Sequence, residues 1–248
     1  MVREKKKKTS RWKLILLAIF SIILALGILA LLMVKVFVVK NVKVEGNELY
    51  DDNLIKTTVL NDKYSWNSLY VFLKYTFTDT QQLPFIDTME ITMEDPQTLN
   101  IKVYEKGLLG YLYIPAIGQN AYFDKDGIVV ETSTRIIENV PRMEGLGCDT
   151  VVLYEKLPIE DKLLKQLLTL TQTLKRDQLE PDAILYGVKN SPVLKYADVS
   201  VNLGSMQYLT QKVERVRKIL PQLAGMAGTL HLENWDEQTT NIVFEKAE

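Results

Sequence analysis

Cysteine and histidine are nearly missing from this chain of 248 residues, which contains one of each, Cys148 and His231. A single cysteine cannot form a disulfide within the chain, so its folded parts depend on packing for their stability. A disulfide between the Cys148 residues of two copies of the chain is an alternative that the sequence leaves open. A single histidine excludes mechanisms that use a histidine pair and metal centres built from several histidines.

Other signs of catalysis are also scarce. Cys148 lies in Gly-Leu-Gly-Cys-Asp without a nearby base, and His231 alternates with leucines on an expected strand, where it faces solvent. Carboxylate pairs such as Asp51 and Asp52 lie where a helix begins, and capping explains them. The sequence contains no glycine-rich loop that would hold a phosphate. We therefore expect a protein that is not an enzyme and that has no cofactor, metal or small-molecule substrate.

Charge is missing from the 21 residues between Leu14 and Val34, of which 15 are Leu, Ile, Phe or Val. As a helix this stretch is about 32 Å long, enough to cross a hydrocarbon core of about 30 Å. A cleaved secretory signal would have a shorter apolar core and small residues after it, which Met33–Phe37 does not provide. The sequence predicts a transmembrane helix over residues 14–34.

The charges on the two sides of this helix differ in sign. Residues 1–13 carry seven Lys or Arg and one Glu, whereas residues 35–248 carry 23 basic and 30 acidic residues. Since basic residues remain in the cytoplasm, residues 1–13 form a cytoplasmic tail and residues 35–248 are exported. The acidic balance of the exported part does not support a surface for nucleic acid or anionic lipid.

Residues 35–106 are expected to form a small α+β domain with the element order β-α-α-β-β. A β-branched strand over 37–44 precedes a helix that Asp51 caps, and a hairpin turns at Glu94–Gln97. Between them, a second helix follows Ser65. Its periodicity predicts one apolar face, made of Leu69, Phe72, Leu73 and Thr76.

Residues 107–248 are expected to form a second, mixed β-sheet domain with two helices. An Asp-Gly pair predicts a hairpin across Asp124–Gly127. One helix follows Pro158 and the other is capped by Ser205. The first of these helices carries an apolar stripe of Leu163, Leu167, Leu170 and Leu174. The final strands are expected at Thr229–Leu232 and Ile242–Phe244.

The last strand is the candidate binding surface. A strand at the end of a chain often lies at a sheet edge, where it can accept a strand from a partner, so we single out Asn241–Glu245. A merely structural final strand is the alternative. Trp235 allows two interpretations: an exposed residue central to binding, or a lid on the core.

Several segments, taken in order, resemble the FtsQ/DivIB family of bacterial cell-division proteins. The basic tail and single anchor are followed by Val42–Asn47, which resembles the start of that family's polypeptide-transport-associated (POTRA) domain. Tyr122–Val129, Val140–Gly145 and Val199–Gly204 resemble its later segments, and a helix ends at Ile219–Pro221 as in the family. Glu105–Gly107 lacks the proline often found after the POTRA domain.

The resemblance implies a non-catalytic scaffold of the division machinery in the bacterial plasma membrane, at the septum. Such a protein binds division proteins of the FtsL and FtsB/DivIC types and helps connect them to septal peptidoglycan synthesis. The implied partner-binding residues are Leu232, Glu233, Asn234, Trp235, Asn241, Ile242, Val243, Phe244 and Glu245. The implied recruitment module contains Val42, Val44, Gly46 and Asn47. Two alternatives stay open: a POTRA-bearing component of an export or envelope-assembly complex, and a membrane-tethered hydrolase.

Overall fold

The computed structural model describes residues 11–80, 82–187, 190–236, 238 and 242–247 and has the expected mixed α+β class. The chain divides into two compact units, Met1–Glu105 and Lys106–Glu248, and each of them contains its own sheet. Helix α1 covers Arg11–Val36, within which Trp12–Val36 is long and apolar enough to cross a membrane. The expected apolar helix is confirmed, and it extends beyond residues 14–34 at both ends.

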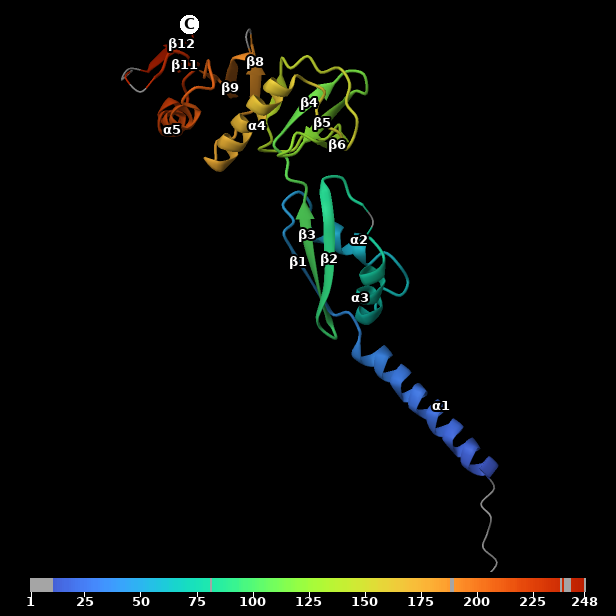
Figure 1. Ribbon diagram of the computed structural model, residues 1–248. Helices are drawn as coiled ribbons and strands as arrows, with labels where there is room; N and C mark the ends of the chain where they lie inside the picture. Colours follow the sequence, from blue (N-terminus) through green and yellow to red (C-terminus); the bar gives the residue numbers. More distant parts are fainter. Residues whose placement is uncertain (1–10, 81, 188–189, 237, 239–241, 248) are drawn as a thin grey trace, which may run out of the picture. The chain divides into compact units, whose positions relative to one another are not determined.

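After α1, the first unit contains a three-stranded sheet and two helices (Figure 1). Its elements are β1 (Asn41–Glu45), α2 (Asp52–Val59), α3 (Ser68–Phe77), β2 (Ile86–Asp95) and β3 (Thr98–Glu105). The strand order is β1-β3-β2, with β1 parallel and β2 antiparallel to β3. The first strand begins later than expected. Val38 instead forms an isolated bridge to Asn67.

Local signals at α2 and at the hairpin are confirmed. The Asp51 side chain accepts a hydrogen bond from the amide of Leu54 and so caps α2. In the hairpin the register aligns Met89 with Val103 and Ile91 with Ile101, all of them buried in the first core. The alternation of apolar residues therefore places one face of this sheet against the helices.

The face that α3 turns toward the core differs from the expected one. Ser68 and Val71 are buried, and Tyr75 packs against the core. Leu73 of the expected apolar face is 45% exposed, and Thr76 is exposed as well. Because α3 is apolar on several faces, its periodicity did not determine which of them the sheet covers.

A nine-stranded mixed sheet forms the second unit, with the order β12-β11-β10-β9-β8-β7-β4-β5-β6. The strands are β4 (Gly110–Ile114), β5 (Gln119–Phe123), β6 (Val129–Ser133), β7 (Arg142–Glu144), β8 (Ala183–Tyr186), β9 (Pro192–Tyr196), β10 (Val199–Asn202), β11 (Gly228–His231) and β12 (Val243–Lys246). Helices α4 (Asp161–Arg176) and α5 (Leu209–Ile219) and the 3-10 helix η2 (Leu220–Leu223) complete the unit. The leucine stripe of α4 is buried in its core, as expected.

Both helices begin later than the sequence predicts. Tyr208, in the left-handed region at φ 55°, precedes α5 in place of Ser205, whose carbonyl accepts a bond from Lys212. Helix α4 begins at Asp161, because the chain turns after Pro158 where the amide of Ile159 donates to Leu157. By contrast, the hairpin across Asp124–Gly127 is confirmed as the connection between β5 and β6.

Candidate interaction site at the terminal strand

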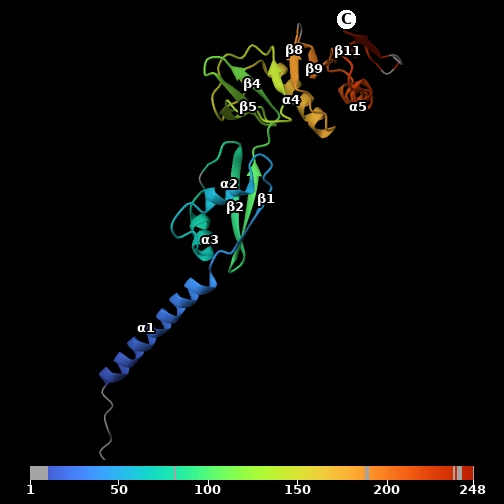
Figure 2. The same ribbon diagram turned by 180° about the vertical axis from the view of Figure 1, so that it is seen from behind.

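Strand β12 lies at one edge of the nine-stranded sheet, where the sequence analysis expects an edge strand. Figures 1 and 2 show β11 and the C-terminal strand at the end of this unit away from β4 and β5. The opposite edge, β6, is partly covered. There Val129 exchanges backbone hydrogen bonds with Tyr154 and Glu155, and the Lys106 ammonium donates to the carbonyl of Val130. Of the two edges, β12 is the one better able to accept another strand.

The hydrogen-bond alternation along β12 follows from one bond at its end. The amide of Ala247 donates to the carbonyl of Ala227 at 2.9 Å. In an antiparallel pair, every second residue exchanges its hydrogen bonds with the neighbouring strand. Counted back in steps of two along the register, Glu245 and Val243 therefore also bond β11.

Strand β11 gives the same result from its other side. The amides of Gly228 and Leu232 donate toward β10, to Asp198 and to Asn202. The residues that alternate with them therefore face β12. On β12, Phe244 and Lys246 direct their N–H and C=O groups away from β11. These outward groups form the candidate docking edge.

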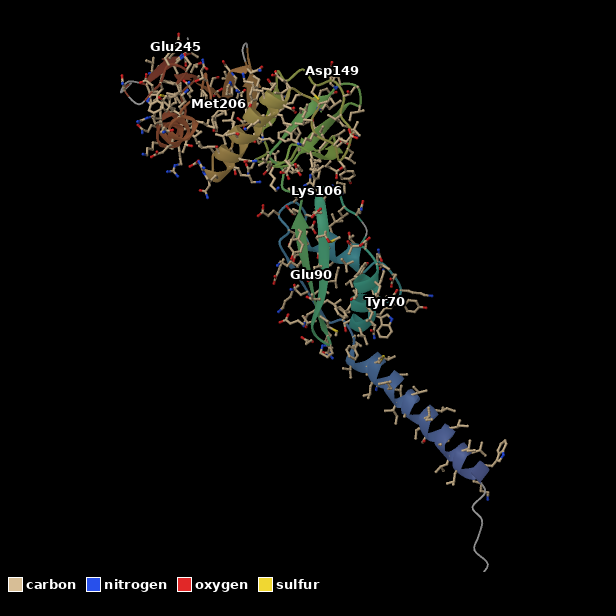
Figure 3. All side chains as sticks on the ribbon, in the orientation of Figure 1. Tyr70, Glu90, Lys106, Asp149, Met206 and Glu245 are labelled. Atoms are coloured by element: carbon tan, nitrogen blue, oxygen red, sulfur yellow. The ribbon has the colours of Figure 1, made fainter. Side chains whose placement is uncertain are left out.

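The two faces of β12 have different chemistry. Phe244 is aligned with the buried Leu230, and both Phe244 and Ile242 pack against the core of the second unit. Val243 is 59% exposed, and with Glu245 it occupies the opposite face. Figure 3 marks Glu245 on this strand. A strand added beside β12 would meet apolar side chains on one face and a mixed surface on the other.

A histidine between two carboxylates joins the last two strands. Nδ1 of His231 lies 2.8 Å from Oε1 of Glu233, and Nε2 lies 3.2 Å from Oε2 of Glu245. These partners raise the pKa of His231 above its ordinary 6.5, with the hydrogen bond to Glu233 as the largest cause. Protonated His231 can donate to both carboxylates at once. Glu233 and Glu245 of the predicted set are therefore brought together by a residue outside it.

We expect the stability of the β11–β12 pair to depend on pH through His231. Since folding raises this pKa, the stabilisation is fully present below pH 6.5 and is lost as the pH rises through the folded-state pKa. His231→Gln should therefore lower the free energy of unfolding more at pH 5.5 than at pH 8.5. Urea unfolding of residues 40–248 at both pH values measures this difference. An equal loss at the two pH values would contradict the prediction.

Burial decides the roles of the residues before β12. Leu232 is fully buried and Trp235 is 6% exposed, so neither presents its side chain to a partner. Arg215 lies over the Trp235 ring at 4.7 Å, and Tyr208 packs edge-on against it. Trp235 is therefore a lid on the core, the second of its two interpretations. Asn234 is exposed, and Asn241 lies outside the described residues.

Near Trp235, the buried Lys212 of α5 binds the segment that follows β10. Nothing in the sequence pattern of α5 indicated that this lysine is buried. Lys212 is 1% exposed, and its ammonium donates to the carbonyls of Leu203 at 2.7 Å and Ser205 at 3.1 Å. Burial lowers the pKa of Lys212, and the nearby Glu233 carboxylate opposes this effect. Lys212 thus fastens α5 to the end of β10 beside the Glu233–Trp235 segment.

The residues of the expected recruitment module have structural roles in the first unit. Val42 and Val44 pack against its core. Gly46 has φ +80°, and a Cβ there would lie 2.4 Å from the carbonyl oxygen of Val103, so only glycine fits. The side-chain amide of Asn47 donates to the backbone carbonyl of Tyr50 in the loop that follows. Recruitment by these residues stays a prediction.

Cys148 is in an environment that does not favour reactivity. Cys148 is buried, its thiol lies 3.4 Å from the carbonyl of Thr150, and burial raises its pKa, which disfavours the reactive thiolate. Within the described ranges, no three His, Cys, Asp or Glu side chains are grouped to hold a metal ion.

The chain matches no protein-family model and no curated protein. The geometry of the docking edge is therefore the structural basis for a functional assignment.

Proposed function

We propose that the protein is a non-catalytic scaffold of bacterial cell division, of the FtsQ/DivIB kind. The observation that carries this proposal is the docking edge, at which Phe244 and Lys246 direct backbone donors and acceptors outward. An extended segment of a partner can pair with such an edge through main-chain hydrogen bonds. The β-α-α-β-β order of the first unit supports a POTRA domain, and the ordered family motifs support the same assignment.

In this proposal the protein brings partners together at the membrane. Helix α1 anchors the chain with the basic tail in the cytoplasm and both units outside. The added strand comes from an FtsB/DivIC-type protein, with an FtsL-type protein in the same complex. The backbone of β12 supplies affinity, and the exposed side chains of Val243 and Glu245 on that strand and of Asn234 before it supply contacts specific to the partner. The assembled complex is connected to septal peptidoglycan synthesis.

Recovery of partners from membranes tests this function. We expect affinity-tagged protein, crosslinked in growing cells and purified in detergent, to recover small division proteins with single anchors and coiled coils. A Phe244→Pro variant that accumulates to a normal level should recover much less of them than Phe244→Ala does. Recovery of export or envelope-assembly proteins in their place would overturn the proposal in favour of the first alternative. Recovery of neither class would also overturn it.

A further inference from the structure

Helix α3 and the loop before it carry an apolar stripe that faces away from the sheet. Trp66 is 45% exposed, Leu73 is 45% exposed and Phe77 is 81% exposed. Leu69, Leu73 and Phe77 recur at intervals of four residues along one side of α3, and Trp66 lies in the turn before the helix, three residues ahead of Leu69. The opposite side of α3 carries Val71 and packs on the core. No apolar side chain among the described residues of the first unit covers Trp66, Leu73 and Phe77 enough to bury them.

The start of this stripe is fastened to the chain just after α1. The amide of Ser68 donates to the carbonyl of Phe37 at 2.9 Å, and the amide of Val39 donates to the carbonyl of Trp66 at 2.8 Å. Phe37 directly follows the last residue of α1. Three extended residues span about 10 Å, so Trp66 lies within about that distance of the end of the membrane-spanning helix. This follows from the covalent chain and two hydrogen bonds.

A second connection involves Asn67. Its side-chain oxygen accepts from the amide of Tyr70 and so caps α3, while its side-chain nitrogen donates to the carbonyl of Met33 at 3.1 Å. Met33 is in the last turn of α1, where backbone carbonyls have no intrahelical partner. One side chain thus satisfies the start of α3 and the end of α1.

The charges near the stripe are mostly positive, in contrast to the exported part as a whole. Lys35 is in the last turn of α1, Lys40 lies shortly after it, and Lys63 and Lys74 lie before and within α3. Two acidic residues oppose them: Asp62, which forms an ion pair with Lys74 at 2.8 Å, and Asp79 just after α3. The exposed Tyr64 ring lies beneath the Lys63 ammonium at 4.8 Å. Aromatic and basic side chains together are typical of the boundary between a bilayer and water.

We propose that the stripe of Trp66, Leu69, Leu73 and Phe77 rests in the surface of the bilayer that α1 spans. The inference depends on the membrane anchor of the proposed function and is independent of any division partner. The aromatic rings occupy the headgroup region, and the neighbouring lysines contact lipid phosphates. This second contact adds to the hydrogen bonds that join the end of α1 to the start of α3, and it holds the folded part of the first unit against the membrane.

Spin labels on the full chain in lipid nanodiscs test this proposal. In a Cys148→Ser background, Leu73→Cys carries the label on the stripe, and Glu90→Cys carries the control label on the exposed side of β2. Figure 3 marks Glu90 on that strand. We expect collisions with a water-soluble nickel chelate to be about twofold or more lower at position 73 than at position 90. Adding Trp66→Ser and Phe77→Ser should raise collisions at position 73 to the control level.

Each outcome has one meaning. Equal nickel accessibility at the two positions, in protein that has entered the nanodisc, would overturn the docking and leave the proposed function intact. Failure of the chain to enter nanodiscs would overturn both the anchor and the docking. A low accessibility at position 73 that persists in the double-serine variant would show shielding by protein and would also overturn the proposal.

Discussion

Phe244→Pro should weaken binding of the exported segment of the proposed FtsB/DivIC-type partner by about tenfold or more relative to Phe244→Ala. Proline has no N–H, and the amide of Phe244 points away from β11, so the substitution removes a bond to the partner and leaves the native ladder intact. The proline ring also occupies the space of the approaching strand. A loss of about 1.4 kcal/mol corresponds to the tenfold change. Titration of the partner segment into residues 40–248 measures it.

The alanine variant is the matched control, because it removes the same ring and keeps the donor. Phe244 packs against the core of the second unit, and each variant loses that contact. Val243→Pro is a second control, which removes an amide that faces β11 in place of one that faces the partner. The amide of Val243 faces β11, so proline there should detach β12 itself and increase amide exchange in β11. If Phe244→Pro binds as tightly as Phe244→Ala while both retain their fold, the partner does not add a strand at this edge.

The sequence predicted those parts of the structure that depend on neighbouring residues. Asp51 caps α2 because its carboxylate reaches the amide of Leu54, three residues away. Asp124–Gly127 forms a hairpin because glycine accepts φ +76° at Gly127 and the amides of the turn bond to Asp124. In both cases the decisive contacts lie within four residues. Such patterns can therefore be recognised in the sequence without knowledge of tertiary contacts.

Contacts between distant residues were beyond this kind of prediction. The apolar periodicity of α3 contained several candidate faces, and only the position of the sheet decides that Val71 is inside and Leu73 is outside. For the candidate site, the final strand was expected at a sheet edge because it lies at the end of the chain, whereas the direction of each amide depends on the register with β11. Burial of Trp235 under Arg215 depends on α5.

The burial of Lys212 could not be predicted from the sequence, because its contacts are made with a different element of the fold. Lysine on a helix is usually exposed, and its place among the apolar residues of α5 gave no indication of a buried ammonium. Its partners are backbone carbonyls of Leu203 and Ser205, which any sequence provides. Only the approach of α5 to the end of β10 creates this contact.

Lys212→Ala should lower the free energy of unfolding of the second unit by about 2–6 kcal/mol. The change leaves two carbonyls near the core without their donor and removes a buried aliphatic stem, and each effect is worth about 1–3 kcal/mol. Lys212→Met keeps the stem and removes the buried charge, so it should cost less than alanine. Urea unfolding of residues 40–248 in a Trp66→Phe background, followed by the fluorescence of the buried Trp235, measures both changes.

Lys218→Ala is the matched control on the same helix. Lys218 pairs with Glu214 at 2.6 Å, but its side chain is 65% exposed, and an exposed pair of this kind contributes little to stability. Its loss should leave the unfolding of the second unit nearly unchanged. Because Lys212 fastens α5 beside the Glu233–Trp235 segment, its alanine variant should also increase amide exchange in β11 and β12, and Lys218→Ala should not. Equal destabilisation by the two alanine variants would show that the buried ammonium does not hold α5 in place.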